Sequence, residues 1–197
     1  MKKIPTMFER VFDGHKIVDI LPNFTNNDCE KALKIGVPTV KYDGAACAYI
    51  RGYLYKRLNF GKAKQIPVNT EIIFCESKPD TVTGHWPVWV RCSRDKPQDV
   101  HFFAAYDNYF SSPQFLTDGA SYEAIGPHFQ KNPHCLPVDT LIEHGTVVAE
   151  LPARTFEGVK EWLETHNEEG LVFWLNNRPV CKIKRSDFCL PWRGYGK

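Results

Sequence analysis

Four short patterns in this sequence carry residue types that can perform chemistry on a nucleotide. In chain order they are Lys41-Tyr42-Asp43-Gly44, Tyr122-Glu123-Ala124-Ile125-Gly126-Pro127, Glu169-Gly170-Leu171-Val172-Phe173 and Lys182-Ile183-Lys184. Each pattern is common by itself, so the prediction depends on their order along one chain. Together they supply a lysine nucleophile, two separate carboxylates and a pair of further lysines. Such a set can hold a nucleotide and attack its α-phosphate with an amine.

Lys41 is the candidate nucleophile. A lysine attacks only after losing its proton, and because its reference pKa is about 10.4 the protein must activate it by desolvation, nearby cations or a metal ion. Lys182 and Lys184 alternate on an expected strand, so their side chains point to one face. Two cations there can grip a phosphate and discourage the nucleophile from holding its proton. The predicted product is a phosphoramidate, with pyrophosphate released.

Two glutamates are candidates for the remaining contacts. Phosphoryl chemistry needs charge neutralisation, normally by Mg²⁺ with oxygen ligands, and Glu169 is a candidate ligand just before an expected strand. Glu123, also on an expected strand, can accept hydrogen bonds from ribose hydroxyls. Isolated glutamates are usually surface charges, so spacing alone assigns neither role.

Short strands dominate the expected secondary structure. They are bounded by Gly, Pro and Asn turns and are rich in Ile, Phe, Val and Trp. The expected ranges are 40–50 with a break at Asp43-Gly44, 53–57, 71–75, 86–92, 120–125, 171–175 and 180–183. Hairpin turns are expected at Arg51-Gly52 and across Asn176-Asn177-Arg178-Pro179.

Two helices complete the prediction. Within residues 99–116, four aromatic residues fall at helical spacing, a stripe more typical of a core than of a base-stacking platform: Phe102, Phe103, Tyr106 and Phe110. Thr155 is expected to cap a helix that runs to about Thr165. Many short strands with few helices favour an α+β fold of mainly antiparallel sheets.

Composition indicates an ordinary globular chain. Its 197 residues suffice for one well-buried domain or two small ones, and no apolar run approaches the ~20 residues needed to cross a bilayer. Polar residues follow the first cations too soon for a signal peptide. The seven cysteines include no Cys-x-x-Cys, which argues against a zinc knuckle or a thioredoxin-like motif. A cytoplasmic protein is therefore expected.

Basic residues gather in two places, although the net charge of +2 is too small to predict nucleic-acid binding alone. One cluster contains Lys56, Arg57, Lys62 and Lys64, and the other contains Lys182, Lys184, Arg185, Arg193 and Lys197. Such clusters are usually solvated faces. Beside a nucleotide-handling site they become candidate phosphate contacts.

The ordered patterns resemble the motifs of the covalent nucleotidyltransferase superfamily, which comprises ATP-dependent RNA and DNA ligases and mRNA capping enzymes. The resemblance implies that Lys41 becomes adenylylated or guanylylated. It assigns ribose binding to Glu123 and metal binding to Glu169. Lys182 and Lys184 would contact the α-phosphate.

Three further roles follow from the same resemblance. Arg57 is similar to an arginine that contacts ribose or phosphate in RNA ligases. His144 has the position of a residue that stacks on adenine, although a histidine before glycine is more often a loop or capping residue. Asp43 would orient Lys41 or a metal-bound water.

The nearest likeness is to small single-domain RNA ligases, a family that includes the vertebrate 5′-to-3′ RNA ligase and bacterial and viral relatives. The matching stretches are spread over nearly the whole length of the chain: 3–8, 84–90, 122–133, 154–158 and 182–192. Three residues depart from the family pattern. Ala45 stands where threonine is expected, His128 where lysine is expected, and Cys189 where glycine is expected.

The family implies one nucleotidyltransferase (ATP-grasp-like) domain over residues 1–197, with mainly antiparallel sheets and flanking helices. Only 13 residues follow Lys184, too few for an OB-fold. The implied activity is ATP-dependent joining of RNA 5′-phosphate and 3′-hydroxyl ends through lysyl-AMP and an adenylylated RNA. Its cofactors would be ATP and Mg²⁺ or Mn²⁺, with RNA as partner and no membrane or obligate protein partner.

Two alternatives stay open at this point. A minimal DNA ligase of the same superfamily would use the same residues on a different substrate. A non-catalytic nucleotide-binding or RNA-binding relative would bind ATP without covalent labelling. The presence of every motif lysine and carboxylate favours an enzyme.

Overall fold

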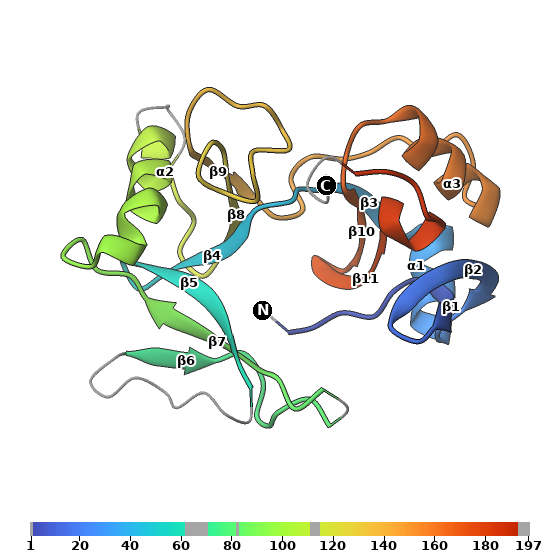
Figure 1. Cartoon of the computed structure of the whole chain (residues 1–197), viewed down its shortest axis with the longest axis horizontal. Helices are drawn as coiled ribbons and strands as arrows, with labels where there is room; N and C mark the ends of the chain where they lie inside the picture. The colour runs from blue at the N-terminus through green and yellow to red at the C-terminus, as the bar shows by residue number, and fades with distance from the viewer. Residues whose placement is uncertain (1, 62–70, 82, 111–114, 193–197) are drawn as a thin grey trace. The chain divides into compact units, whose positions relative to one another are not determined.

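The computed structural model describes residues 2–61, 71–81, 83–110 and 115–192. The chain forms two compact units, each assembled from separate stretches of sequence (Figure 1). Unit 1 consists of Met1–Lys3 and Asp43–His144, and unit 2 of Ile4–Tyr42 and Gly145–Lys197. This division into compact units does not test the expectation of one nucleotidyltransferase domain over residues 1–197, which stays a prediction.

Unit 2 is built on a three-stranded antiparallel sheet in the order β11-β10-β3. Its strands are β3 (Val37–Lys41), β10 (Gly170–Leu175) and β11 (Arg178–Lys184). Asn176 and Asn177 join β10 to β11 with φ angles of 49° and 58°. Two residues with positive φ make the tight turn that suits a right-twisted hairpin. The loop is therefore shorter than expected, because the last two of the four residues assigned to it begin β11.

One face of this sheet is buried against two helices, α1 (Asn27–Ile35) and α3 (Phe156–Thr165) (Figure 1). The buried apolar residues on that face alternate along the central and edge strands: Leu171, Phe173, Cys181 and Ile183. The predicted cap of α3 is confirmed, since Thr155 accepts a hydrogen bond from the backbone N–H of Gly158. A two-stranded ribbon of β1 (Phe8–Asp13) and β2 (Lys16–Phe24) and a 3₁₀ helix η2 (Arg185–Phe188) complete the unit.

Unit 1 is built on a six-stranded antiparallel sheet in the order β6-β7-β5-β4-β8-β9. These strands are β4 (Ala45–Ile50), β5 (Tyr53–Phe60), β6 (Ile72–Phe74), β7 (Trp86–Arg91), β8 (Ser121–Ile125) and β9 (Thr140–Glu143). Helix α2 (Val100–Phe110), preceded by a 3₁₀ turn η1 (Pro97–Asp99), packs through Phe102 and Ala105 on the face that buries Cys47 and Tyr122. Phe102, Phe103 and Tyr106 of the expected aromatic stripe pack against this core, as expected, and the side chain of Phe110 lies outside the described part of the structure.

The described residues confirm an α+β fold with three α-helices and mainly antiparallel strands. Two details differ from the prediction. The strand expected over residues 40–50 contributes to two sheets, because β3 ends at Lys41 and β4 begins at Ala45. The helix expected over 99–116 is α2 alone, and the described residues Phe115 and Leu116 are not helical. None of the helices in the described ranges is long and apolar enough to cross a membrane.

Candidate functional site

The sheet of unit 2 places three of the predicted lysines on one face. Gly170 of β10 lies opposite Lys41 of β3 on one side and opposite Lys184 of β11 on the other. Residues in register on neighbouring strands point to the same side, and so do residues two apart on one strand. Lys182 therefore shares this side with Lys184. We call it the lysine face; the opposite side of the sheet is the apolar core.

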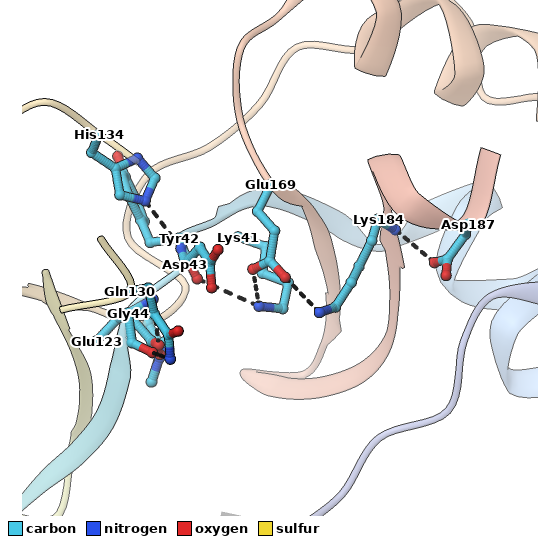
Figure 2. A network of polar contacts seen from close by, with 11 residues as sticks. Lys41, Tyr42, Asp43, Gly44, Glu123, Gln130, His134, Glu169, Lys184 and Asp187 are labelled. Atoms are coloured by element: carbon cyan, nitrogen blue, oxygen red, sulfur yellow. Dashed lines mark hydrogen bonds and ion pairs between the residues drawn. The ribbon is translucent and has the colours of Figure 1, made fainter. Parts of the chain in front are cut away.

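Glu169 provides the carboxylate at the centre of the lysine face. It directly precedes β10 and is 1% exposed. Its Oε2 accepts a hydrogen bond from Lys41 Nζ, and its Oε1 lies 2.5 Å from Lys184 Nζ. Figure 2 shows both ammonium groups directed at this carboxylate. A buried carboxylate is costly without compensating charge, so the two edge strands and Glu169 are electrostatically coupled.

The backbone around Glu169 is held as tightly as its side chain. Its carbonyl accepts a hydrogen bond of 2.9 Å from the N–H of Arg185. A Cβ atom added at Gly170 would come within 2.1 Å of the Ile183 carbonyl oxygen. Only glycine at this position lets β10 and β11 approach closely enough to bring Lys184 to the carboxylate.

Lys182 is the lysine whose acidity the surroundings change most clearly. Its side chain is half-buried, and this burial, followed by the neighbouring charges of Lys184 and Lys41, lowers its pKa to about 8. The sequence predicted that Lys182 and Lys184 would together disfavour a proton on Lys41. In the structure, burial and the charges of Lys184 and Lys41 disfavour the proton on Lys182, and the expectation for Lys41 stays a prediction.

In unit 1, Glu123 of β8 is the corresponding centre of polar contacts. Its Oε1 accepts a hydrogen bond of 3.1 Å from the N–H of Gly44, and its Oε2 lies 2.8 Å from His144 Nε2. The other ring nitrogen of His144 lies 2.9 Å from Ser121 Oγ. Both edges of the imidazole are thus engaged, and only its faces are left for stacking on a base.

Two residues that sequence reasoning missed hold the start of unit 1 beside Glu123. The N–H of Asp43 donates to His134 Nε2 at 3.0 Å, and Gln130 Nε2 donates to the carbonyl of Gly44 at 3.2 Å (Figure 2). These contacts fix the main chain just after the candidate nucleophile. His134 and Gln130 lie about 90 residues away in sequence, in irregular structure, and carry no local signal that could have identified them.

Arg57 shares its side of the sheet with Glu123. Lys56 lies opposite Cys47, which lies opposite Tyr122, and this row faces α2. The strands β5 and β8 flank β4, and side chains alternate between the two sides of a strand. Arg57 follows Lys56 on β5 and Glu123 follows Tyr122 on β8, so both point to the side away from α2. Arg57 Nε is buried and has no hydrogen-bond partner among the described residues. A buried guanidinium nitrogen without an acceptor is costly, and an anionic ligand would satisfy it.

Two members of the predicted basic clusters are structural. Lys56 forms an ion pair with the fully buried Asp99, on the α2 side of the sheet. Arg185 is buried and donates from Nη1 to the carbonyls of Leu163 and His166 at the end of α3. Both side chains already have partners within the chain, and their role as phosphate contacts stays a prediction. Lys62, Lys64, Arg193 and Lys197 lie outside the described residues.

The structure thus brings the predicted residues together in two groups. Lys41, Glu169, Lys182 and Lys184 form one group in unit 2, and Asp43, Arg57, Glu123 and His144 belong to unit 1. The peptide bond between Tyr42 and Asp43 joins the nucleophile of the first group to the second. Comparison with known protein families and with curated proteins found no match for this chain.

Glu169 also fits the metal-binding role that the resemblance implies. A carboxylate oxygen is the ligand type that Mg²⁺ and Mn²⁺ prefer. Although Lys184 is close, Glu169 Oε1 is buried and accepts no aligned hydrogen bond from the described residues. This oxygen therefore retains acceptor capacity for a cation.

The lowered pKa of Lys182 predicts a pH-dependent effect on stability. At pH 7 this lysine is charged in both folded and unfolded chains, and its burial beside two cations is destabilising. Between pH 8 and 10.5 it is neutral only when folded, so stability rises across this window. Replacing Lys182 with Met should increase the free energy of unfolding by about 1–2 kcal/mol at pH 7, with the gain shrinking toward pH 10.

Urea denaturation at several pH values measures this difference, with Lys31→Met, at an exposed position on α1, as the matched control. A gain from Lys182→Met that stays constant from pH 7 to pH 10 would show that the environment of Lys182 does not lower its pKa.

Proposed function

We propose that this protein is an ATP-dependent RNA ligase that works through a covalent lysyl-AMP. The observation that carries the proposal is the pairing of Lys41 and Lys184 with the buried carboxylate of Glu169, with Lys182 on the same face of the sheet. Three amines around one carboxylate make a site of net positive charge, which suits a polyphosphate. The order of the sequence motifs supplies the reaction class.

In the first step, Lys41 Nζ attacks the α-phosphorus of ATP. A nitrogen–phosphorus bond forms, the bond from the α-phosphorus to the bridging oxygen breaks, and pyrophosphate leaves with that oxygen. Nζ loses a proton to solvent, because the attacking amine needs its lone pair. Lys182 and Lys184 are positioned on the same face to stabilise negative charge that develops on the α-phosphate.

The contact between Lys41 and Glu169 must loosen for this attack. The carboxylate of Glu169 holds Lys41 in place, and ATP phosphates would offer Lys184 and Lys182 another anionic partner. Glu169 would hold the divalent ion, which when bound neutralises charge on the triphosphate. The same carboxylate thereby orients the nucleophile before ATP arrives and is withdrawn from it afterwards.

The residues of unit 1 keep in this proposal the roles expected from the sequence. Glu123 would accept hydrogen bonds from ribose hydroxyls, and its existing contacts to Gly44 and His144 fix the carboxylate for that purpose. The ring faces of His144 would stack on adenine. Arg57, on the same side of the sheet as Glu123, would bind ribose or phosphate oxygen through its unpaired Nε.

The last two steps transfer the nucleotide to RNA and seal the strand. An oxygen of the RNA 5′-phosphate attacks the phosphorus of lysyl-AMP, breaking the nitrogen–phosphorus bond and forming a 5′–5′ pyrophosphate linkage. A 3′-hydroxyl oxygen then attacks the RNA phosphorus, a phosphodiester forms, AMP leaves and the hydroxyl proton is released. ATP is thus converted to AMP and pyrophosphate for each bond made.

Strand joining tests this proposal. With ATP and Mg²⁺ or Mn²⁺, the wild type should join 5′-phosphorylated RNA supplied as single strands or as a nick. Lys41→Arg should abolish joining while keeping the positive charge beside Glu169, because a guanidinium is a poor nucleophile. Lys34→Arg, at an exposed position on α1, is the matched control and should retain activity.

Nicked DNA is assayed in parallel. Efficient joining of nicked DNA but not of RNA would replace the RNA ligase proposal with a minimal DNA ligase. No joining of any substrate, together with ATP binding, would indicate a non-catalytic relative.

Arg57 gives a second prediction. Arg57→Gln should reduce the efficiency of lysyl-AMP formation at limiting ATP by about 10- to 100-fold, the loss expected for a hydrogen bond to a charged group. Stability should change little, because Nε has no partner in the described chain. Arg91→Gln is the control, since Arg91 pairs with Glu71 at the surface. Equal lysyl-AMP formation by the two variants would show that Arg57 does not contact the nucleotide.

A further inference from the structure

Unit 1 contains a cluster of potential metal ligands that the ligase proposal does not use. His101 lies in the first turn of α2, His128 follows β8, and Asp139 directly precedes β9. One nitrogen from each histidine and one carboxylate oxygen of Asp139 all lie within 4.8 Å of one another. The first turn of α2 and the connection between β8 and β9 therefore converge on one point.

The two imidazoles share one oxygen of Asp139. Nδ1 of His128 lies 2.7 Å from Oδ2, and Nδ1 of His101 lies 3.9 Å from the same atom. The rings are stacked, with centroids 3.7 Å apart and planes 12° apart. At 2.7 Å, the contact between His128 Nδ1 and Asp139 Oδ2 is a hydrogen bond, with the ring N–H donating to the carboxylate. A divalent ion bound between these atoms would take the place of that proton, because imidazole nitrogens and carboxylate oxygens are both metal ligands.

Asp139 is fixed before any ion arrives. It is 4% exposed, and its Oδ1 accepts a hydrogen bond of 3.1 Å from the N–H of His128. Its carbonyl accepts one of 2.8 Å from Asn108 of α2. A Cβ atom at Gly126 would come within 2.7 Å of Oδ1, so the chain packs directly on the carboxylate. Oδ2 is left as the oxygen that faces both rings.

We propose that His101, His128 and Asp139 form a binding site for a divalent transition-metal ion such as Zn²⁺. Imidazole and carboxylate together suit Zn²⁺, whereas Mg²⁺ prefers oxygen ligands alone. Bonds of ~2.0–2.2 Å to zinc place neighbouring ligand atoms roughly 3–3.5 Å apart. Small rotations of the two partly exposed rings reach that spacing, and solvent can complete the coordination.

An ion in this site would link the first turn of α2 to the segment between β8 and β9. These strands carry Glu123 and lead into His144, so the site would stabilise unit 1. The inference is independent of the ligase proposal, because it concerns different residues and its readout is metal binding. Failure of strand joining would leave it standing.

The test is Zn²⁺ titration of the chelator-stripped protein in competition with a chromogenic chelator, with Co²⁺ absorption spectra alongside. His101→Ala and His128→Ala are the test variants, and His15→Ala, at an exposed position between β1 and β2, is the matched control. Circular dichroism establishes that each variant is folded. Two test variants are used so that a folding defect in one does not decide the result.

Wild type and His15→Ala should bind one Zn²⁺ that each test variant binds at least about tenfold more weakly. The Co²⁺ complex should show ligand-field bands without thiolate charge transfer, because no cysteine is a proposed ligand. Saturating Zn²⁺ should raise the melting temperature of the wild type by roughly 5 °C and leave His101→Ala nearly unchanged. Equal affinity in all four proteins, or no binding by the wild type, would overturn the proposal.

Discussion

The buried carboxylate of Glu169 is the constraint on which the candidate site depends. Buried without partners, this charge would be strongly destabilising, and lysines from two different strands compensate it. Gly170 makes that possible, because it lies opposite Lys41 of β3 and opposite Lys184 of β11. The strand pairing that forms the sheet therefore also compensates the charge of Glu169 and places Lys41. A shift in strand register would separate the lysines from the carboxylate.

Local signals explain what the sequence predicted. Thr155 caps its helix through a contact three residues away, and Asn176-Asn177 forms a hairpin turn through its own backbone preference. The same holds for the alternation of Lys182 and Lys184. Cys189 has a φ of 56°, a left-handed conformation that favours glycine, which is the residue expected there from the family pattern.

What the sequence could not predict depends on long-range contacts. The burial of Arg185 and Lys56 follows from helix ends and acidic partners that only the folded chain brings near, so both looked like free surface cations. The contacts of His134 and Gln130 are of the same kind. The predicted secondary structure left out β1, β2 and α1, although Asn26 caps α1 by accepting a hydrogen bond from the N–H of Cys29, a local signal of the same kind as Thr155. The convergence of His101 with His128 and Asp139 likewise needs α2 packed beside the connection between β8 and β9.

The central claim is that Lys41, and no other lysine, accepts AMP. The most direct measurement is mass spectrometry of the intact protein after incubation with ATP and Mg²⁺, followed by peptide mapping. The account predicts one AMP per chain, located on Lys41 and removed again by pyrophosphate, which reverses the first step. Lys182 is the natural rival, since its pKa of about 8 leaves more of it neutral near physiological pH than an ordinary lysine. An AMP mapped to Lys182, or no adduct under any ATP and metal condition, would contradict the account.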